Sequence, residues 1–258
     1  MEFDDDLIAC AQIVERADPD RFATVMAAKP AARAVLFPIY AFNVEVSRAP
    51  WVTSEPMIAE MRLQWWYDAL DEVIAGGVVR RHEVVTPLAL AVDAEVARLL
   101  QQVVEARRRD IEPVPFDDGT EFESYIEATG GALMEAASRA LGDRDGRAAR
   151  GLGFATGLAA YLLAVPELEA RGKAPLADGT EAAVAGHAAQ GLERLKAARA
   201  ARRNVPGAAR PALWPGWMAA PVLKAAAQAP GRVKDGTLRP SEARQRGRRL
   251  WVASTGRW

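Results

Sequence analysis

The chain has 258 residues, of which 50% are hydrophobic and 26% are charged, which is the composition of a globular protein and excludes a disordered or fibrous one. One large domain is expected at this length. The only cysteine, Cys10, excludes an intrachain disulfide, favours a reducing compartment and is expected to be a small buried residue. The two histidines, His82 and His187, are far apart in sequence and have no cysteines nearby, so we expect no zinc site.

Charge is distributed unevenly along the chain, although the formal net charge is only -1. Residues 1–75 contain 13 acidic and 6 basic residues, and residues 192–258 contain 3 acidic and 15 basic residues. A basic C-terminal region indicates an anionic partner, and a solvated face that balances the acidic N-terminal region is the alternative. The acidic start of the chain does not predict a signal peptide, and the apolar run 151–166 is too short to predict a membrane span.

The N-terminal half is expected to be helical nearly throughout. Helices are predicted over about 6–17, after Pro30 to about 44, from Pro56 to about 69, and from Thr86-Pro87 through Val104 to a point before Glu112. Asp4–Asp6 are expected to cap the first helix. Residues 78–85 have strand-like composition, but their central Arg-Arg-His-Glu predicts a loop.

The C-terminal half continues the helical pattern. Helices are predicted over about 121–141, 151–166, 180–203, 217–228 and 241–252, with Asp117 and Asp118 before the first and Gly142 after it. The pair Gly130-Gly131 would cost about 1 kcal/mol per glycine in an isolated helix, so we expect a neighbour to approach its backbone closely. The prediction is an all-α, single-domain helical bundle over residues 1–230, followed by a basic C-terminal tail over residues 231–258.

Several motifs resemble the squalene/phytoene synthase family, which joins two prenyl diphosphates head to head. They are Tyr-Ala-Phe-Asn-Val-Glu-Val (Tyr40–Val46), Met-Arg-Leu-Gln-Trp-Trp (Met61–Trp66), Ala-Arg-Arg-Arg-Asp-Ile-Glu-Pro (Ala106–Pro113), Tyr-Ile-Glu-Ala-Thr-Gly-Gly (Tyr125–Gly131) and the segment 153–175. Their order and spacing match the family from about residue 25 to residue 176. The resemblance implies a bundle of the isoprenoid synthase type.

The family's chemistry depends on two aspartate-rich motifs on facing helices, where carboxylates hold Mg²⁺ against the departing diphosphate. The resemblance places the first acidic positions at Ser47, Arg48 and Trp51. It places the second pair at Ala164 and Leu168. None of these residues supplies a carboxylate, so no catalytic residue, no metal ligand and no cofactor is expected here. Nearby Glu45, Glu167 and Glu169 are expected to be solvated or locally paired.

Within the family, Tyr40–Glu45 and Met61–Trp66 look most like a divergent branch that includes the mitochondrial complex I assembly factor of this fold. This resemblance implies a pseudoenzyme, an assembly or scaffolding protein that meets subunits or intermediates of a membrane respiratory complex. It implies a cytoplasmic location, peripheral on the inner membrane, and a lipid or isoprenoid as ligand. The alternative is an active prenyltransferase that holds Mg²⁺ with displaced ligands.

The resemblance also indicates residues of a central cavity, for which plain bundle core is the alternative. They are Phe42, Asn43, Arg62, Trp65, Tyr125, Gly157 and Tyr161. Arg62 would lie on an apolar stripe, so we expect it to have a buried partner. In the C-terminal tail, membrane or partner contact is predicted at Arg244, Arg248, Arg249 and Trp251. Nucleic acid is not expected as a partner, because no recognised motif accompanies the basic residues.

Overall fold

The computed structural model describes residues 4–112 and 114–258, and its regular structure in these ranges consists of helices without strands. The helices of the first half are α1 (Asp5–Ala17), α2 (Pro19–Met26), α3 (Pro30–Arg48), η1 (Ala49–Trp51), α4 (Pro56–Ala75), α5 (Val85–Ala91) and α6 (Ala94–Arg108). Those of the second half are α7 (Gly119–Ile126), η2 (Glu127–Gly131), α8 (Ala132–Ala140), α9 (Arg147–Ala170), α10 (Glu181–Ala201), η3 (Arg202–Asn204), η4 (Arg210–Met218), α11 (Ala219–Gln228), α12 (Gly231–Lys234) and α13 (Glu242–Thr255).

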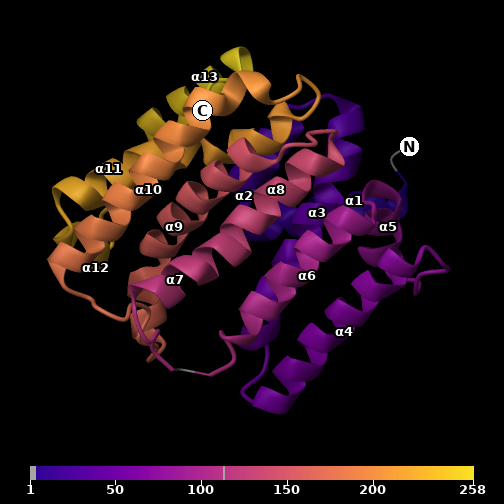
Figure 1. Cartoon of the computed structure of the whole chain (residues 1–258), viewed down its shortest axis with the longest axis horizontal. Coiled ribbons are helices and arrows are strands. Elements are labelled where there is room, and N and C mark those ends of the chain that lie inside the picture. Colours follow the sequence, from indigo (N-terminus) through magenta and orange to yellow (C-terminus); the bar gives the residue numbers. More distant parts are fainter. Residues whose placement is uncertain (1–3, 113) are drawn as a thin grey trace.

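The helices pack side by side in one continuous bundle, which confirms the predicted fold class. In Figure 1 the order runs from α4 at one edge through α6, α8, α9 and α10 to α11 at the other, and each of these helices packs on the next. Helix α3 packs against α1, α5 and α8. Nearly all buried apolar side chains form one cluster, which begins at Leu7 and ends at Trp258.

Helix α9 is the central core helix. It is long and apolar enough to cross a bilayer, but 56% of its most apolar window is buried inside the bundle. Its neighbours are η2, α8, α10, α11 and η4. Burial on several sides explains why the sequence of this helix is apolar all round.

Most helix ends follow the predicted capping chemistry. The side chain of Asp4 accepts a hydrogen bond from the Leu7 N–H (2.9 Å), and that of Asp118 accepts from the N–H groups of Thr120 (2.8 Å) and Glu121 (2.9 Å). Gly142 follows α8 with a φ of +95°, a conformation that favours glycine. The capping functions predicted for Asp4 and Asp118 are therefore confirmed.

One local prediction is wrong, and one helix was not predicted. The long helix expected from Thr86-Pro87 to before Glu112 is two helices, because Val92 is extended and Asp93 caps α6 by accepting from the Val96 N–H (2.9 Å). The short helix α2 was not expected; Pro19 occupies its first turn, and the Asp18 side chain caps it through the Arg21 N–H (2.9 Å).

The Gly130-Gly131 pair lies where two helices cross, as predicted. The chain forms a π-helical turn there, η2, between α7 and α8. A Cβ atom on Gly130 would lie 2.7 Å from the carbonyl oxygen of Gly153 and 2.8 Å from Cα of Gly157, both on α9. Glycine is therefore required for the backbones of η2 and α9 to touch.

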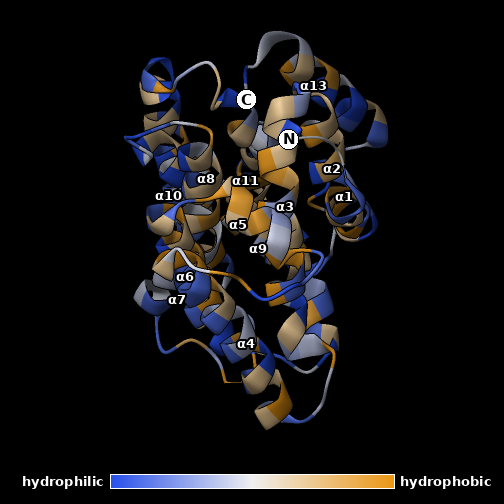
Figure 2. Ribbon diagram, turned by 90° about the vertical axis from the view of Figure 1, so that its right-hand side faces the viewer, coloured by the Kyte–Doolittle hydropathy of each residue, from blue (hydrophilic) through white to orange (hydrophobic). Residues whose placement is uncertain are grey.

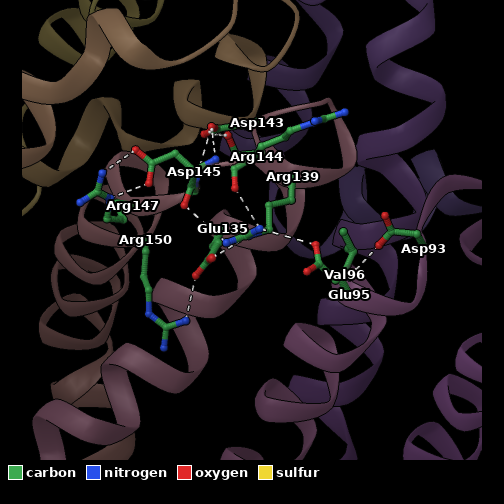
Figure 3. A network of polar contacts seen from close by, with 12 residues as sticks. Asp93, Glu95, Val96, Glu135, Arg139, Asp143, Arg144, Asp145, Arg147 and Arg150 are labelled. Atoms are coloured by element: carbon green, nitrogen blue, oxygen red, sulfur yellow. Dashed lines mark hydrogen bonds and ion pairs between the residues drawn. The ribbon is translucent and has the colours of Figure 1, made fainter.

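A polar network ties α8 and α9 together on one side of this crossing (Figure 3). Arg150 pairs with Glu135 (2.9 Å) and with Glu127 (2.5 Å), and Arg139 pairs with Glu135 (2.7 Å). The Glu135 side chain is only 8% exposed, so its charge depends on these two arginines.

Candidate functional site

A cavity of about 380 Å³ opens at one end of the bundle. Its walls come from the C-terminal ends of α3, α6 and α9, from α7 with η2, and from the loop that follows α9. In Figure 1 the C-terminal ends of α6 and α9 lie toward the lower side of the molecule. Each helix therefore delivers a few residues to a common space.

The residues at the family's acidic positions face this cavity from two walls. Ser47 and Trp51 line it from α3 and η1, and Ala164 and Leu168 line it from α9. The Ser47 hydroxyl donates to the carbonyl of Val44 (3.0 Å). The structure thus brings four of the five predicted positions together, and the fifth, Arg48, is exposed.

These residues do not fit a magnesium centre. Mg²⁺ prefers carboxylate oxygens, and this pair of walls presents a hydroxyl, an indole and two aliphatic side chains instead. The acids that line the cavity are Asp110, Glu112 and Glu167. Asp110 is paired with Arg107 (3.0 Å) and Glu167 with Arg171 (2.5 Å), and Glu45, outside the lining, is paired with Arg48 (3.5 Å). Within residues 4–112 and 114–258, no three Asp, Glu, His or Cys side chains converge as metal ligands.

Trp51, where the resemblance places an acidic residue, packs against two cations. The Arg171 guanidinium and the Lys173 ammonium each lie 5.3 Å from the centre of the Trp51 ring. Lys173 also donates to the carbonyl of Asp110 (3.0 Å), and burial lowers the pKa of its ammonium. An indole between two cations leaves a positive rim where the family would need a negative one.

A buried polar triad closes another side of the cavity. Arg107 donates to Asp110 (3.0 Å) and to the Tyr125 hydroxyl (2.5 Å), and that hydroxyl donates to Asp110 (2.9 Å). Burial, partly offset by the nearby Arg107, raises the pKa of Tyr125 well above its usual value. The phenol therefore stays neutral and acts as a donor. Each of the three side chains thus has a partner within the triad, although Nε of Arg107 is buried without one.

Four of the seven predicted cavity residues line the cavity: Asn43, Tyr125, Gly157 and Tyr161. The other three lie elsewhere. Phe42 is fully buried and packs edge-on against Trp66, with ring centres 5.5 Å apart. Trp65 stacks under Arg80, whose guanidinium carbon lies 4.9 Å from the ring centre.

The structure corrects the prediction made for Arg62. This arginine is exposed on α4, so the buried partner expected for it is wrong. Leu63 and Trp66 are the residues of this turn that face the core, and Arg62 lies one position away from that stripe.

Sequence reasoning missed the basic lining of the cavity. Arg107, Arg109 and Lys173 line it, yet the Ala106–Pro113 motif was noted only as a resemblance. Pro113 itself lies outside the described residues. A signal did exist, because three consecutive residues of a helix span about 200° of its circumference, so a helix that packs on one side directs at least one of three such arginines toward its neighbours.

The basic C-terminal residues are folded onto the bundle. Helix α13 packs on η4, and Trp258 is buried. Arg244, Arg248 and Trp251 line one surface groove, while Arg249 pairs with Asp20 (2.9 Å) on a different side. The predicted contact residues are therefore divided between two surfaces. The domain boundary predicted at residue 230 stays a prediction.

Comparisons with known proteins agree with the helical fold. A family model described as squalene/phytoene synthase matches residues 14–178. A dehydrosqualene synthase crystallised with a ligand superposes with a TM-score of 0.79 at 14% identity, covering 96% of this chain and 95% of that one. A squalene synthase from Alicyclobacillus acidocaldarius gives 0.71 at 16% identity, covering 86% and 93%. At these identities the likeness shows the fold, which is the isoprenoid synthase type that was predicted.

Curated relatives carry a different description. The Drosophila melanogaster homologue of NADH dehydrogenase (ubiquinone) complex I assembly factor 6 is 31% identical over 64% of this chain and 52% of its own length. The assembly factor 6 proteins of Bos taurus and Homo sapiens are each 24% identical, over 61% of this chain and 48% of theirs. The chain spans about half the length of these relatives.

Proposed function

This chain belongs to the squalene/phytoene synthase family, and we propose that it is a non-catalytic member that assists assembly of a complex I-like respiratory complex. The observation that carries this proposal is the pair of facing cavity walls, where Ser47 and Trp51 stand opposite Ala164 and Leu168. Relatives named as complex I assembly factors support the partner class. The site of action would be the surface of the membrane that holds the complex.

The loss of catalysis follows from electrostatics. Departure of a diphosphate develops several negative charges, which the family neutralises with carboxylate-bound Mg²⁺. The family's acidic positions carry no carboxylate here, and Glu167, which lines the cavity from α9, is paired with Arg171, so this chain lacks the carboxylate cluster that would gather the cations. Lys173 and Arg171 contribute positive charge at the rim, but both already pack against Trp51. Lys173 and Arg171 can bind the phosphate headgroup of a ligand, but without Mg²⁺ they do not promote the departure of a diphosphate.

The cavity itself suits an amphiphile, and we propose a lipid or an isoprenoid as its ligand. Ile126, Leu133 and Phe116 provide an apolar wall, while Arg107 and Arg109 provide a cationic one. Native mass spectrometry of protein purified without detergent, with lipid extraction, tests this. Ala160→Phe, which fills the cavity, should abolish the bound lipid. Ala197→Phe, on the exposed side of α10, is the matched control.

The assembly role is tested in the native host. Deletion of the gene should lower the amount of assembled complex I on native gels, and a plasmid copy should restore it. A tagged copy should recover complex I subunits from native membranes. Unchanged complex I in the deletion strain would contradict the proposal. Loss of an isoprenoid product with intact complex I would instead support the active prenyltransferase with displaced ligands.

A further inference from the structure

A second hollow lies on the surface between α10, α11 and α13, away from the cavity described above. It has a volume of about 820 Å³, and no residue lines both spaces. Six basic side chains line it, and none of its lining residues is acidic. They are Arg199, Lys224, Arg232, Arg244, Arg248 and Arg257. We call this hollow the cationic groove.

The cations of the groove lack the acidic partners that the neighbouring cations have. Outside the groove, Arg246 pairs with Glu242 (3.3 Å), and Arg239 and Arg249 both pair with Asp20. In the described part of the chain, none of the six groove cations forms an ion pair within 4.0 Å. The groove therefore concentrates positive charge that no acidic side chain of the described residues neutralises.

Arg199 is the groove cation on which burial and repulsion between like charges act most clearly. Its guanidinium donates to the carbonyl of Trp258 (3.0 Å) and is half-buried. Burial, together with the like charges of Arg248 and Arg202, lowers its pKa. An anion in the groove would relieve this repulsion, because it would supply the opposite charge that is missing.

The remaining groove lining is apolar and includes an exposed indole. Leu238, Pro221 and Pro240 line the groove together with the indole of Trp251, which is 57% exposed. Leu250, next to Trp251 on α13, is 71% exposed. Cations beside exposed apolar and indole side chains are suited to the interface between lipid headgroups and acyl chains.

We propose that the cationic groove binds the phosphate groups of anionic phospholipids and thereby holds the protein on a membrane surface. Its six unpaired cations complement the negative surface of such a membrane. Nucleic acid fits less well, because binding of single strands uses aromatic side chains on which successive bases stack. Trp251 is the one exposed aromatic residue of the groove, since Trp258 is buried. This proposal is independent of the assembly role and of the cavity ligand.

Vesicle sedimentation with the full chain tests the groove. The vesicles are phosphatidylcholine alone or phosphatidylcholine with phosphatidylglycerol, at low and high salt. The groove variant is Lys224→Gln, Arg244→Gln and Arg257→Gln, whose side chains are all exposed. The control variant is Lys196→Gln, Lys234→Gln and Arg246→Gln, which removes the same charge from exposed positions outside the groove. Thermal unfolding checks that both variants fold.

Each cation near an anionic surface strengthens binding about fivefold, so the groove variant should lose on the order of 100-fold in affinity. The wild-type protein should sediment with the anionic vesicles at low salt, but not at high salt and not with the neutral vesicles. The control variant should lose affinity by no more than a few-fold. Equal losses in the two triple variants would overturn the proposal. Wild-type protein that stays in the supernatant when anionic vesicles are sedimented, but binds a single-stranded RNA oligonucleotide, would also overturn it.

Discussion

Replacing Gly130 by alanine should destabilise the protein, although alanine is the better helix former. The new Cβ atom would lie 2.7 Å from the Gly153 carbonyl oxygen and 2.8 Å from Cα of Gly157. Ordinary contacts of this kind begin at 3.4 Å, so the two backbones must separate by about 0.6 to 0.7 Å (3.4 − 2.8 and 3.4 − 2.7). Neither obstacle is a side chain that could rotate away.

The magnitude follows from two opposing effects. Overpacking of this kind costs about 3 kcal/mol, at the upper end of the usual range because both obstacles are backbone. The gain in helix propensity returns about 1 kcal/mol. The net loss of about 2 kcal/mol should lower Tm by about 4 to 8 °C in a chain of this size.

Gly186 provides the matched control in α10, because nothing lies within 4 Å of a Cβ atom placed there. Gly186→Ala should therefore stabilise the protein by about 1 kcal/mol and raise Tm by about 2 to 4 °C. Circular dichroism during heating and urea unfolding measures both variants. If Gly130→Ala were as stable as Gly186→Ala, the close crossing of η2 and α9 would be refuted.

Two further predictions concern the core. Arg150→Ala removes one of the two arginines paired with the buried Glu135 and the nearer cation of Glu127, so it should cost about 2 kcal/mol in urea unfolding. Arg147→Ala, whose side chain is 86% exposed, should cost at most about 0.5 kcal/mol. Equal costs would contradict the stabilising effect of the Arg150 ion pairs drawn in Figure 3. Burial raises the pKa of the Cys10 thiol to about 12, from an ordinary value of 9.0. The folded state then holds the thiol proton that the unfolded state releases, so this group's contribution to stability should fall as the pH rises from about 9 to 12. A thiol reagent at pH 8 should label Cys10 only after unfolding, and rapid labelling of the native protein would contradict its burial.

The helical class was predictable because the helix signals are local. Pro30 and Pro56 each begin a helix, Asp4 and Asp118 cap theirs, and Gly142 follows one, so neighbouring residues alone decide these boundaries. The division between α5 and α6 was missed because apolar periodicity continues across it, and only the Asp93 cap marks the break. Local chemistry thus predicts where helices begin better than apolar spacing does.

The cavity was only partly predictable, because it depends on contacts between segments far apart in the chain. The acidic positions that the family resemblance placed at Ser47 and Ala164 do meet across the cavity. The stacking of Trp51 with Lys173 joins residues that no local pattern connects. The error at Arg62 was one of helical phase, since a shift of one residue turns a side chain by about 100° from the core toward solvent.

The cationic groove shows the limit of reasoning from charge counts. The sequence shows the excess of basic residues over 192–258. It does not show which of these residues pair with acidic side chains in the folded protein. Arg249 and Arg248 are neighbours in sequence, yet one pairs with Asp20 and the other lines the groove. Only the packing of α13 on the bundle separates them.

The central claim is that the facing walls of the cavity cannot assemble the magnesium cluster that prenyl diphosphate chemistry requires. Purified protein incubated with farnesyl or geranylgeranyl diphosphate and Mg²⁺, followed by measurement of released pyrophosphate and of extracted hydrocarbons, tests it directly. We predict no pyrophosphate above the rate without protein and no C30 or C40 product. Magnesium-dependent formation of either hydrocarbon would contradict the account.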